Sequence, residues 1–104
     1  MTDPVEKLPT KEEFSSETNS LFRARRSDGT EIDLTLLEAR SAISNAVQES
    51  FSLLFRAPVD VVPMQDMFSL ANENLGQMDL FLVPVKKDED GLYYEAVFNN
   101  IVSS

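Results

Sequence analysis

The segment FSLLFRAP, residues 51–58, decides the fold class of this chain. Phe51, Leu53 and Phe55 occupy alternate positions, and a period of two is typical of a β-strand with one buried face. Pro58 ends the segment, because proline has no backbone N–H to donate to a neighbouring strand. The sequence therefore predicts a central strand whose large apolar side chains point into a core.

A β-hairpin is predicted before this strand, in SLFRARRSDGTEIDLTLLEA, residues 20–39. Asp28 and Gly29 are a pair that favours a two-residue type I′ turn, in which both residues take positive φ. On the second arm, Ile32 and Leu34 alternate with polar residues, as in a half-buried strand. We expect two antiparallel strands that meet at this turn.

Residues 35–48 permit two interpretations. In the preferred one, the second arm of the hairpin remains a strand to about residue 38, and a loop or short helical turn covers 41–48. In the rival one, Thr35 and Glu38 form a capping box that starts a helix. Apolar residues then recur at roughly helical spacing up to Val47.

Three further strands are predicted in the second half of the chain. They are QDMFSLAN (65–72), QMDLFLVPV (77–85) and LYYEAVFNNIV (92–102). Gly76 is expected to take the left-handed conformation in the turn between the first two. Pro84 marks the middle one as an edge strand or as the site of a β-bulge.

Several short strands separated by turn signals predict a mainly β domain, a small antiparallel barrel or sandwich of five or six strands with one or two short helices. Residues 1–9, with two prolines, are expected to form a flexible lead-in, and residues 10–104 a single domain. The predicted core consists of Phe51, Leu53, Phe55, Phe68, Leu70, Leu80, Leu82, Ala96 and Phe98.

One of the short helices is expected at residues 10–16. Thr10 and Glu13 have the spacing of a capping box, in which each side chain accepts from the other residue's backbone N–H. Phe14 is the one large apolar residue of this segment. It is the anchor of the expected helix, which could plug one end of a barrel. The alternative for this segment is a surface turn.

The composition disfavours several classes of function. Acidic residues outnumber basic ones 18 to 9, and the net charge of −9 disfavours nucleic acid and anionic membranes as partners. The absence of histidine and cysteine removes the usual general base, the thiol nucleophile and the commonest zinc ligands. We therefore expect a protein that is not an enzyme, with no catalytic residue, cofactor or metal. The lack of cysteine and of a secretory signal favours the cytoplasm.

Two sets of acidic residues raise the hypotheses of a calcium site and of an acid–base pair. DED at 88–90 resembles a fragment of a calcium loop, but it lies between two predicted strands, where a solvated turn is the commoner structure. Asp66 and Asp79 lie on neighbouring predicted strands, where two carboxylates can share acid–base work. Their places in the alternation put them on opposite faces, so we expect no catalytic pair.

The cluster RARR, residues 23–26, is the only basic cluster of the chain. In a strand, Arg23 and Arg25 share a face and form a fork that suits a carboxylate or phosphate. The preferred interpretation is that they pair with Glu31 and Asp33 on the other arm of the hairpin, where exposed ion pairs contribute little to stability.

The segments FSLLFRAP, LG, DLFLVPV, DG and YYEAVFN follow in order from Phe51 to Asn99. This pattern resembles a small bacterial domain family of unknown function and covers about half of the chain. Ala57 stands where the family pattern has glycine, and QDMFSLAN lacks the glycine and tyrosine that relatives often carry there. The resemblance implies a small β-rich accessory domain without assigned catalytic residues. It also implies a link to phage-tail-like assemblies, because some members are encoded near phage-tail-collar-like proteins.

Two classes of function follow from these observations. The first is a non-enzymatic binding or structural module whose partner is a protein, either a second copy or another chain, unless the 10–16 helix covers the same apolar face. The alternative is a small-molecule-binding barrel, or a carboxylate-based enzyme, with its site at the barrel mouth. The residues predicted for an interaction surface are Phe81, Val83, Val85, Arg23 and Arg25.

Overall fold

The computed structural model describes residues 9–44 and 48–101. One short helix and six strands follow one another along the chain. They are α1 (Lys11–Ser15), β1 (Leu21–Arg25), β2 (Glu31–Ser44), β3 (Gln48–Ala57), β4 (Asp66–Asn72), β5 (Gly76–Asp88) and β6 (Gly91–Ile101). The predicted mainly β class, with five or six strands and one or two short helices, is confirmed.

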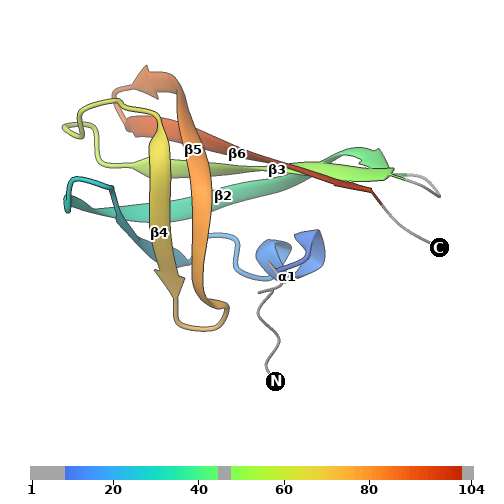
Figure 1. Ribbon diagram of the computed structural model, residues 1–104. Helices are drawn as coiled ribbons and strands as arrows, with labels where there is room; N and C mark the ends of the chain where they lie inside the picture. Colours follow the sequence, from blue (N-terminus) through green and yellow to red (C-terminus); the bar gives the residue numbers. More distant parts are fainter. Residues whose placement is uncertain (1–8, 45–47, 102–104) are drawn as a thin grey trace.

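The six strands form one antiparallel sheet that closes on itself. Its order is β1-β2-β3-β6-β5-β4, and β4 returns to pair with β1. The barrel alternative is therefore the observed one, and the sandwich is not. Figure 1 shows β4 and β5 crossing the view steeply, while β2, β3 and β6 extend together to the right. β6 lies between β3 and β5, so the last strand in sequence completes the ring.

The interior of the ring is filled by side chains from every strand. Phe55 and Tyr94 are fully buried, and so is Phe68, whose ring packs edge-on against Tyr94 at a centroid distance of 5.3 Å. All of the core residues that alternation predicted are buried. The structure adds further members, which are Phe14, Phe22, Ala24, Ile32, Leu34, Leu36, Ala57, Met78, Leu92 and Tyr94.

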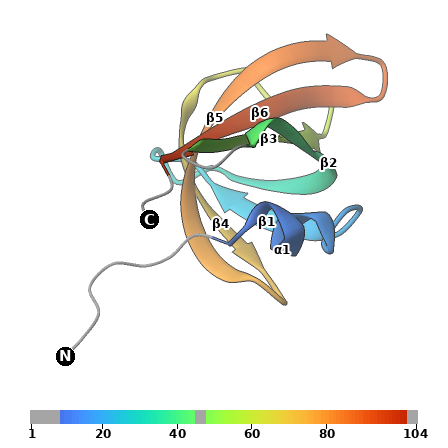
Figure 2. The same ribbon diagram turned by 90° about the vertical axis from the view of Figure 1, so that its right-hand side faces the viewer.

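The helix α1 forms as the capping box predicts. The Thr10 hydroxyl accepts from the Glu13 backbone N–H at 3.1 Å, and the Glu13 carboxylate accepts from the Thr10 N–H at 2.8 Å. Phe14 is fully buried, and its ring lies 5.7 Å from Phe98 and 6.2 Å from Phe51 between centroids. Figure 2 shows α1 beside β1 at one end of the ring. The prediction that Phe14 plugs this end is confirmed.

The turn of the first hairpin differs from the predicted type I′ turn. Gly29 takes a positive φ of 91°. Asp28 has a negative φ, since Asn19 is the only described non-glycine residue with a positive one. The Arg26 N–H donates to Thr30, and the Gly29 N–H donates to Arg26. The loop is thus one residue longer than a two-residue turn, and its single left-handed position is the glycine.

The interpretation of 41–48 as a loop or helical turn is wrong for residues 41–44 and 48, and the rival helix from Thr35 is wrong as well. β2 continues to Ser44 and pairs with β3, which begins at Gln48; residues 45–47 lie outside the described part. Two irregularities, between Leu36 and Glu38 and between Ser41 and Ile43, interrupt the register. A bulge adds one residue to one strand and moves the alternation to the other face, which hides a strand from pattern analysis.

Burial of Phe55 leads to a stability prediction. Its ring contacts Phe22 edge-on at 5.3 Å, and the side chain is fully enclosed. We expect Phe55→Ala to lower the free energy of unfolding by about 3–5 kcal/mol, because truncation leaves a cavity. Chemical denaturation measures this change. The matched control is Phe81→Ala, whose ring is 49% exposed and whose truncation costs less than about 1 kcal/mol. Equal losses for the two variants would contradict the assignment of Phe55 to the core.

Candidate functional site

The arginines on β1 are paired within the hairpin, as the preferred interpretation holds. Arg25 Nη2 lies 2.7 Å from a Glu31 carboxylate oxygen, and Arg23 Nε lies 3.6 Å from Asp33. All four side chains are well exposed, so each pair contributes little to stability. These two arginines therefore form part of a solvated face and do not join the other predicted surface residues on β5.

Asp66 and Asp79 lie on opposite faces of the sheet, as predicted. Asp66 lies opposite Leu82 and accepts from the Ser27 backbone N–H at 3.1 Å and from the Ser27 hydroxyl at 2.8 Å. Asp79 is exposed and accepts from the Ser69 hydroxyl at 3.1 Å. The two carboxylates cannot act on one substrate atom.

The acidic segment at 88–90 forms a hairpin turn. Asp88 Oδ1 accepts from the Asp90 N–H at 2.8 Å, from the Gly91 N–H at 3.2 Å and from the Tyr93 hydroxyl at 3.2 Å. These bonds hold the pKa of Asp88 below its usual value, chiefly through the Asp90 N–H. Within residues 9–44 and 48–101, no group of three acidic side chains converges on a metal position. The carboxylate at 88 closes a turn.

Pro84 lies at a bulge, and the interpretation of β5 as an edge strand is wrong for the strand as a whole. β5 pairs with β4 on one side and with β6 on the other, and the register shifts between Pro84 and Lys86. The ladder with β6 nevertheless stops at the pair Val83–Glu95. β5 continues for seven residues before this point, and β6 continues to Ile101. In the described part of the chain, the two strands therefore part and leave facing edges without partners.

A surface groove of about 360 Å³ lies where these strands part, and we call it the outer corner. Phe81 and Val97 are the exposed apolar side chains of this corner, with 49% and 63% of their surface accessible. Met67, directly opposite Phe81 on β4, extends the apolar surface. The residues that line the groove are Asp79, Leu80, Phe81, Val83, Glu95, Ala96, Val97 and Phe98.

The structure thus brings together two of the residues predicted for an interaction surface, Phe81 and Val83. Val85 is exposed on the same strand but does not line the groove. The helix α1 does not cover Phe81, because Phe14 points instead toward the aromatic cluster inside the ring. Sequence analysis missed Val97, since nothing in a single sequence shows which residues of β6 lie beside β5.

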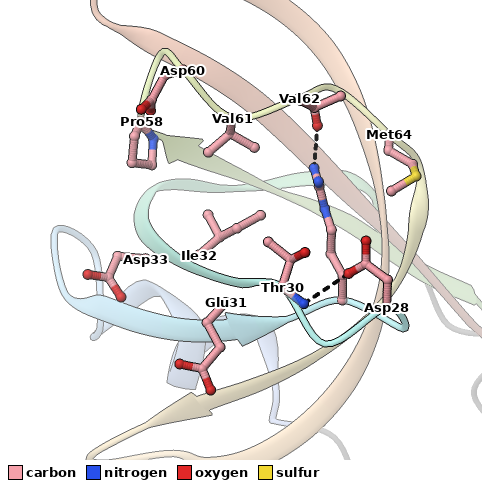
Figure 3. A pocket seen from close by; sticks show the side chains of 11 residues that line it. Asp28, Thr30, Glu31, Ile32, Asp33, Pro58, Asp60, Val61, Val62 and Met64 are labelled. Carbon is pink, nitrogen blue, oxygen red and sulfur yellow. Dashed lines mark hydrogen bonds between the residues drawn. The ribbon is translucent and has the colours of Figure 1, made fainter.

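A second opening, which we call the mouth cleft, lies between the first hairpin and the β3–β4 loop, residues 58–65. Its volume is about 770 Å³, within the range of ligand sites in proteins. In Figure 3, Pro58, Asp60 and Val61 of the loop lie across from Ile32 and its neighbours on β2. The cleft exists because the β2–β3 ladder begins only at Thr35, opposite Arg56. Glu31–Leu34 therefore pair with β1 alone among the described strands.

Arg26 forms the back of the mouth cleft, and sequence analysis assigned it no role. It is 5% exposed, and its Nη2 donates to the Val62 carbonyl and to the Tyr94 hydroxyl, each at 2.5 Å. The guanidinium carbon lies 5.6 Å from the centre of the Phe68 ring. Its Nε is buried without an acceptor, and no described carboxylate lies within 4 Å. Arg26 therefore fastens the loop to the hairpin through Nη2, while its Nε–H donates no hydrogen bond within the described chain.

Family comparison adds one decisive observation. A model of the domain of unknown function DUF6916 matches residues 9–98, which is most of the chain. The chain belongs to the DUF6916 family. No curated protein and no solved structure matches it significantly. Membership agrees with the resemblance found in the second half of the sequence and assigns no activity. In the part of this DUF6916 chain that the structure describes, no helix has the length and apolar character needed to cross a bilayer.

The role of Arg26 as a fastener leads to a prediction for Arg26→Met. The variant leaves the enclosed Tyr94 hydroxyl without its partner, so we expect a loss of about 1–3 kcal/mol in the free energy of unfolding. We also expect faster proteolysis within the 58–65 loop. Arg25→Met is the control, because it removes the neighbouring arginine from an exposed pair. A 58–65 loop that stays as protease-resistant as in the parent protein would refute the fastening role.

The bonds to Asp66 lead to a prediction on pH. The Ser27 hydroxyl and then the Ser27 N–H hold the pKa of Asp66 below its usual value. A lowered folded-state pKa contributes stability that is present above the unfolded-state pKa, about 4, and is lost as pH falls through the folded-state pKa. We expect Asp66→Asn to be less stable than the parent protein at pH 7. Denaturation curves at decreasing pH should show this difference shrinking below about pH 4. A difference that is constant with pH would contradict the stated cause.

Proposed function

We propose that this DUF6916 chain is a non-enzymatic interaction module that binds another protein through the outer corner. One observation carries the proposal: β5 and β6 part at Val83 with their edges unpaired, and exposed apolar side chains line the gap. Unpaired strand edges beside apolar side chains are a template for an added strand or an inserted side chain. Phe81 is the central anchor of this surface.

Charge supports another protein over a second copy of the chain. Asp79 and Glu95 flank the apolar residues of the groove, and each copy carries a net charge of −9. Two copies that met through this corner would bring like charges together, which opposes association. A partner with basic residues around an apolar patch is electrostatically complementary.

Composition supports a role without catalysis. The chain contains no histidine or cysteine, and Asp66 and Asp79 face different sides of the sheet. The filled interior of the ring argues against the alternative of a ligand held inside the barrel. The family resemblance described above supports an accessory role in a phage-tail-like assembly, with the partner being a component of that assembly.

Substitution of Phe81 tests the proposal. We expect Phe81→Asp to abolish capture of the partner from a lysate of the native host, because the carboxylate places a charge in the apolar groove. Val85→Asp is the matched control, since it introduces the same charge on the same strand outside the groove. Captured proteins are identified by mass spectrometry, and sedimentation of the purified chain reports self-association. Loss of the partner with both variants, or with neither, would rule out the outer corner as its site.

A further inference from the structure

The mouth cleft presents the backbone of β2 to solvent as an unused strand edge. Glu31–Leu34 pair with β1 on one side, and β3 turns away at Pro58 before it reaches them on the other. The loop that faces this edge forms its own turn, through the bond from the Val61 N–H to the Pro58 carbonyl. Space of about 770 Å³ separates the two walls, which is enough for an extended segment to enter.

The walls of the cleft combine apolar side chains with acidic ones. Ile32 is a buried core residue that lines the cleft, and Val62 and Met64 lie on the loop with much of their surface accessible. Asp28, Glu31, Asp33 and Asp60 all line the cleft, against the single cation Arg26. Glu31 and Asp33 already pair with Arg25 and Arg23 on the outer face.

Asp60 is the acidic residue of the cleft that is best placed to meet a partner. It is exposed on the loop, and no described cation lies within 4 Å of it. An occupant therefore suits the cleft best when it carries positive charge on its side chains.

We propose that the mouth cleft binds an extended, basic segment of another protein, which adds to the Glu31–Leu34 edge of β2 as a further strand. The backbone of the segment pairs with β2, its apolar side chains pack on Ile32 and Val61, and a lysine or arginine meets Asp60. This is peptide recognition by strand addition, in which backbone bonds give affinity and side chains give specificity. The site is separate from the outer corner, so the inference goes beyond the function proposed above.

Two other occupants fit the cleft less well. A second copy of the chain that paired through the same edge would set Glu31 and Asp33 against each other, and like charges on facing strands repel. A small anion would meet Arg26, but it would also meet four carboxylates around the same cleft. Both remain distinguishable outcomes of the test below.

The test uses a synthetic peptide of about eight alternating valine and lysine residues, the length of an ordinary strand, capped at both ends. We expect it to bind the full chain and to shift amide resonances within Glu31–Leu34 and the 58–65 loop. Asp60→Lys should weaken binding at least about tenfold, since it reverses the charge that faces the lysines. Asp90→Lys makes the same charge change in the distant β5–β6 turn and should leave the affinity within about twofold.

Two altered peptides separate strand addition from adsorption by charge. Methylation of alternate backbone nitrogens keeps every lysine but removes the donors that strand pairing needs, so binding should be lost. Replacement of lysine by glutamate should also abolish binding. Phe81→Asp should leave the affinity for the lysine peptide unchanged, which distinguishes this site from the outer corner.

Several outcomes would overturn the inference. They are an absence of binding, equal weakening by Asp60→Lys and Asp90→Lys, equal binding of the methylated peptide, and resonance shifts confined to other surfaces. Tighter binding of inorganic phosphate than of the lysine peptide would replace the inference with an anion site at Arg26. Association of the chain with itself that Asp60→Lys strengthens would replace it with pairing between copies.

Discussion

Closure of one sheet with only six strands is the constraint on which the rest of this structure depends. A small ring requires strands that tilt and bend, and the longest strands cannot keep the same two neighbours along their whole length. β2 pairs with β1 up to Thr35 and with β3 from there onward. β5 pairs with β4 up to Leu82 and with β6 from Val83 onward. Each exchange of neighbours leaves part of a strand with one partner. The mouth cleft and the outer corner are these two places, so both openings are products of closure.

Alternation predicted the strands well wherever the register is regular. The segment from Phe51 to Phe55 and the strand around Phe68 keep a strict period of two, and their buried apolar residues were all identified from the sequence. The method failed at the bulges of β2. Leu34 and Leu36 point inward, but after the irregularity at 36–38 the partly buried residue packed on the core is Ala39. The apolar period breaks there, and the broken pattern imitates the spacing of a helix.

The candidate site residues also divide into those that the local sequence predicts and those that depend on the whole fold. Pairing of Arg23 and Arg25 with the facing acids was predictable, because a short turn fixes the register of a hairpin. Arg26 continues the alternate positions of the buried Phe22 and Ala24, so the alternation itself indicated that its side chain points inward. A charged residue beside a turn is nevertheless ordinarily solvated. The grouping of Phe81 with Val97 was not predictable, since it depends on where β5 and β6 separate. That position lies beside the register shift between Pro84 and Lys86.

The place of β6 between β3 and β5 has a consequence for how the chain acquires its structure during synthesis. Ribosomes deliver strands in sequence order, and the five earlier strands emerge before the one that joins the two open ends of the sheet. Until then β3, with Phe51, Leu53 and Phe55, has one edge unpaired along its length, and such edges invite association with other chains. Pairs such as Gln48 with Ile101 are distant in sequence, and closure of long loops is slow. The period between the emergence of β3 and that of β6 is therefore when this chain is most exposed to aggregation.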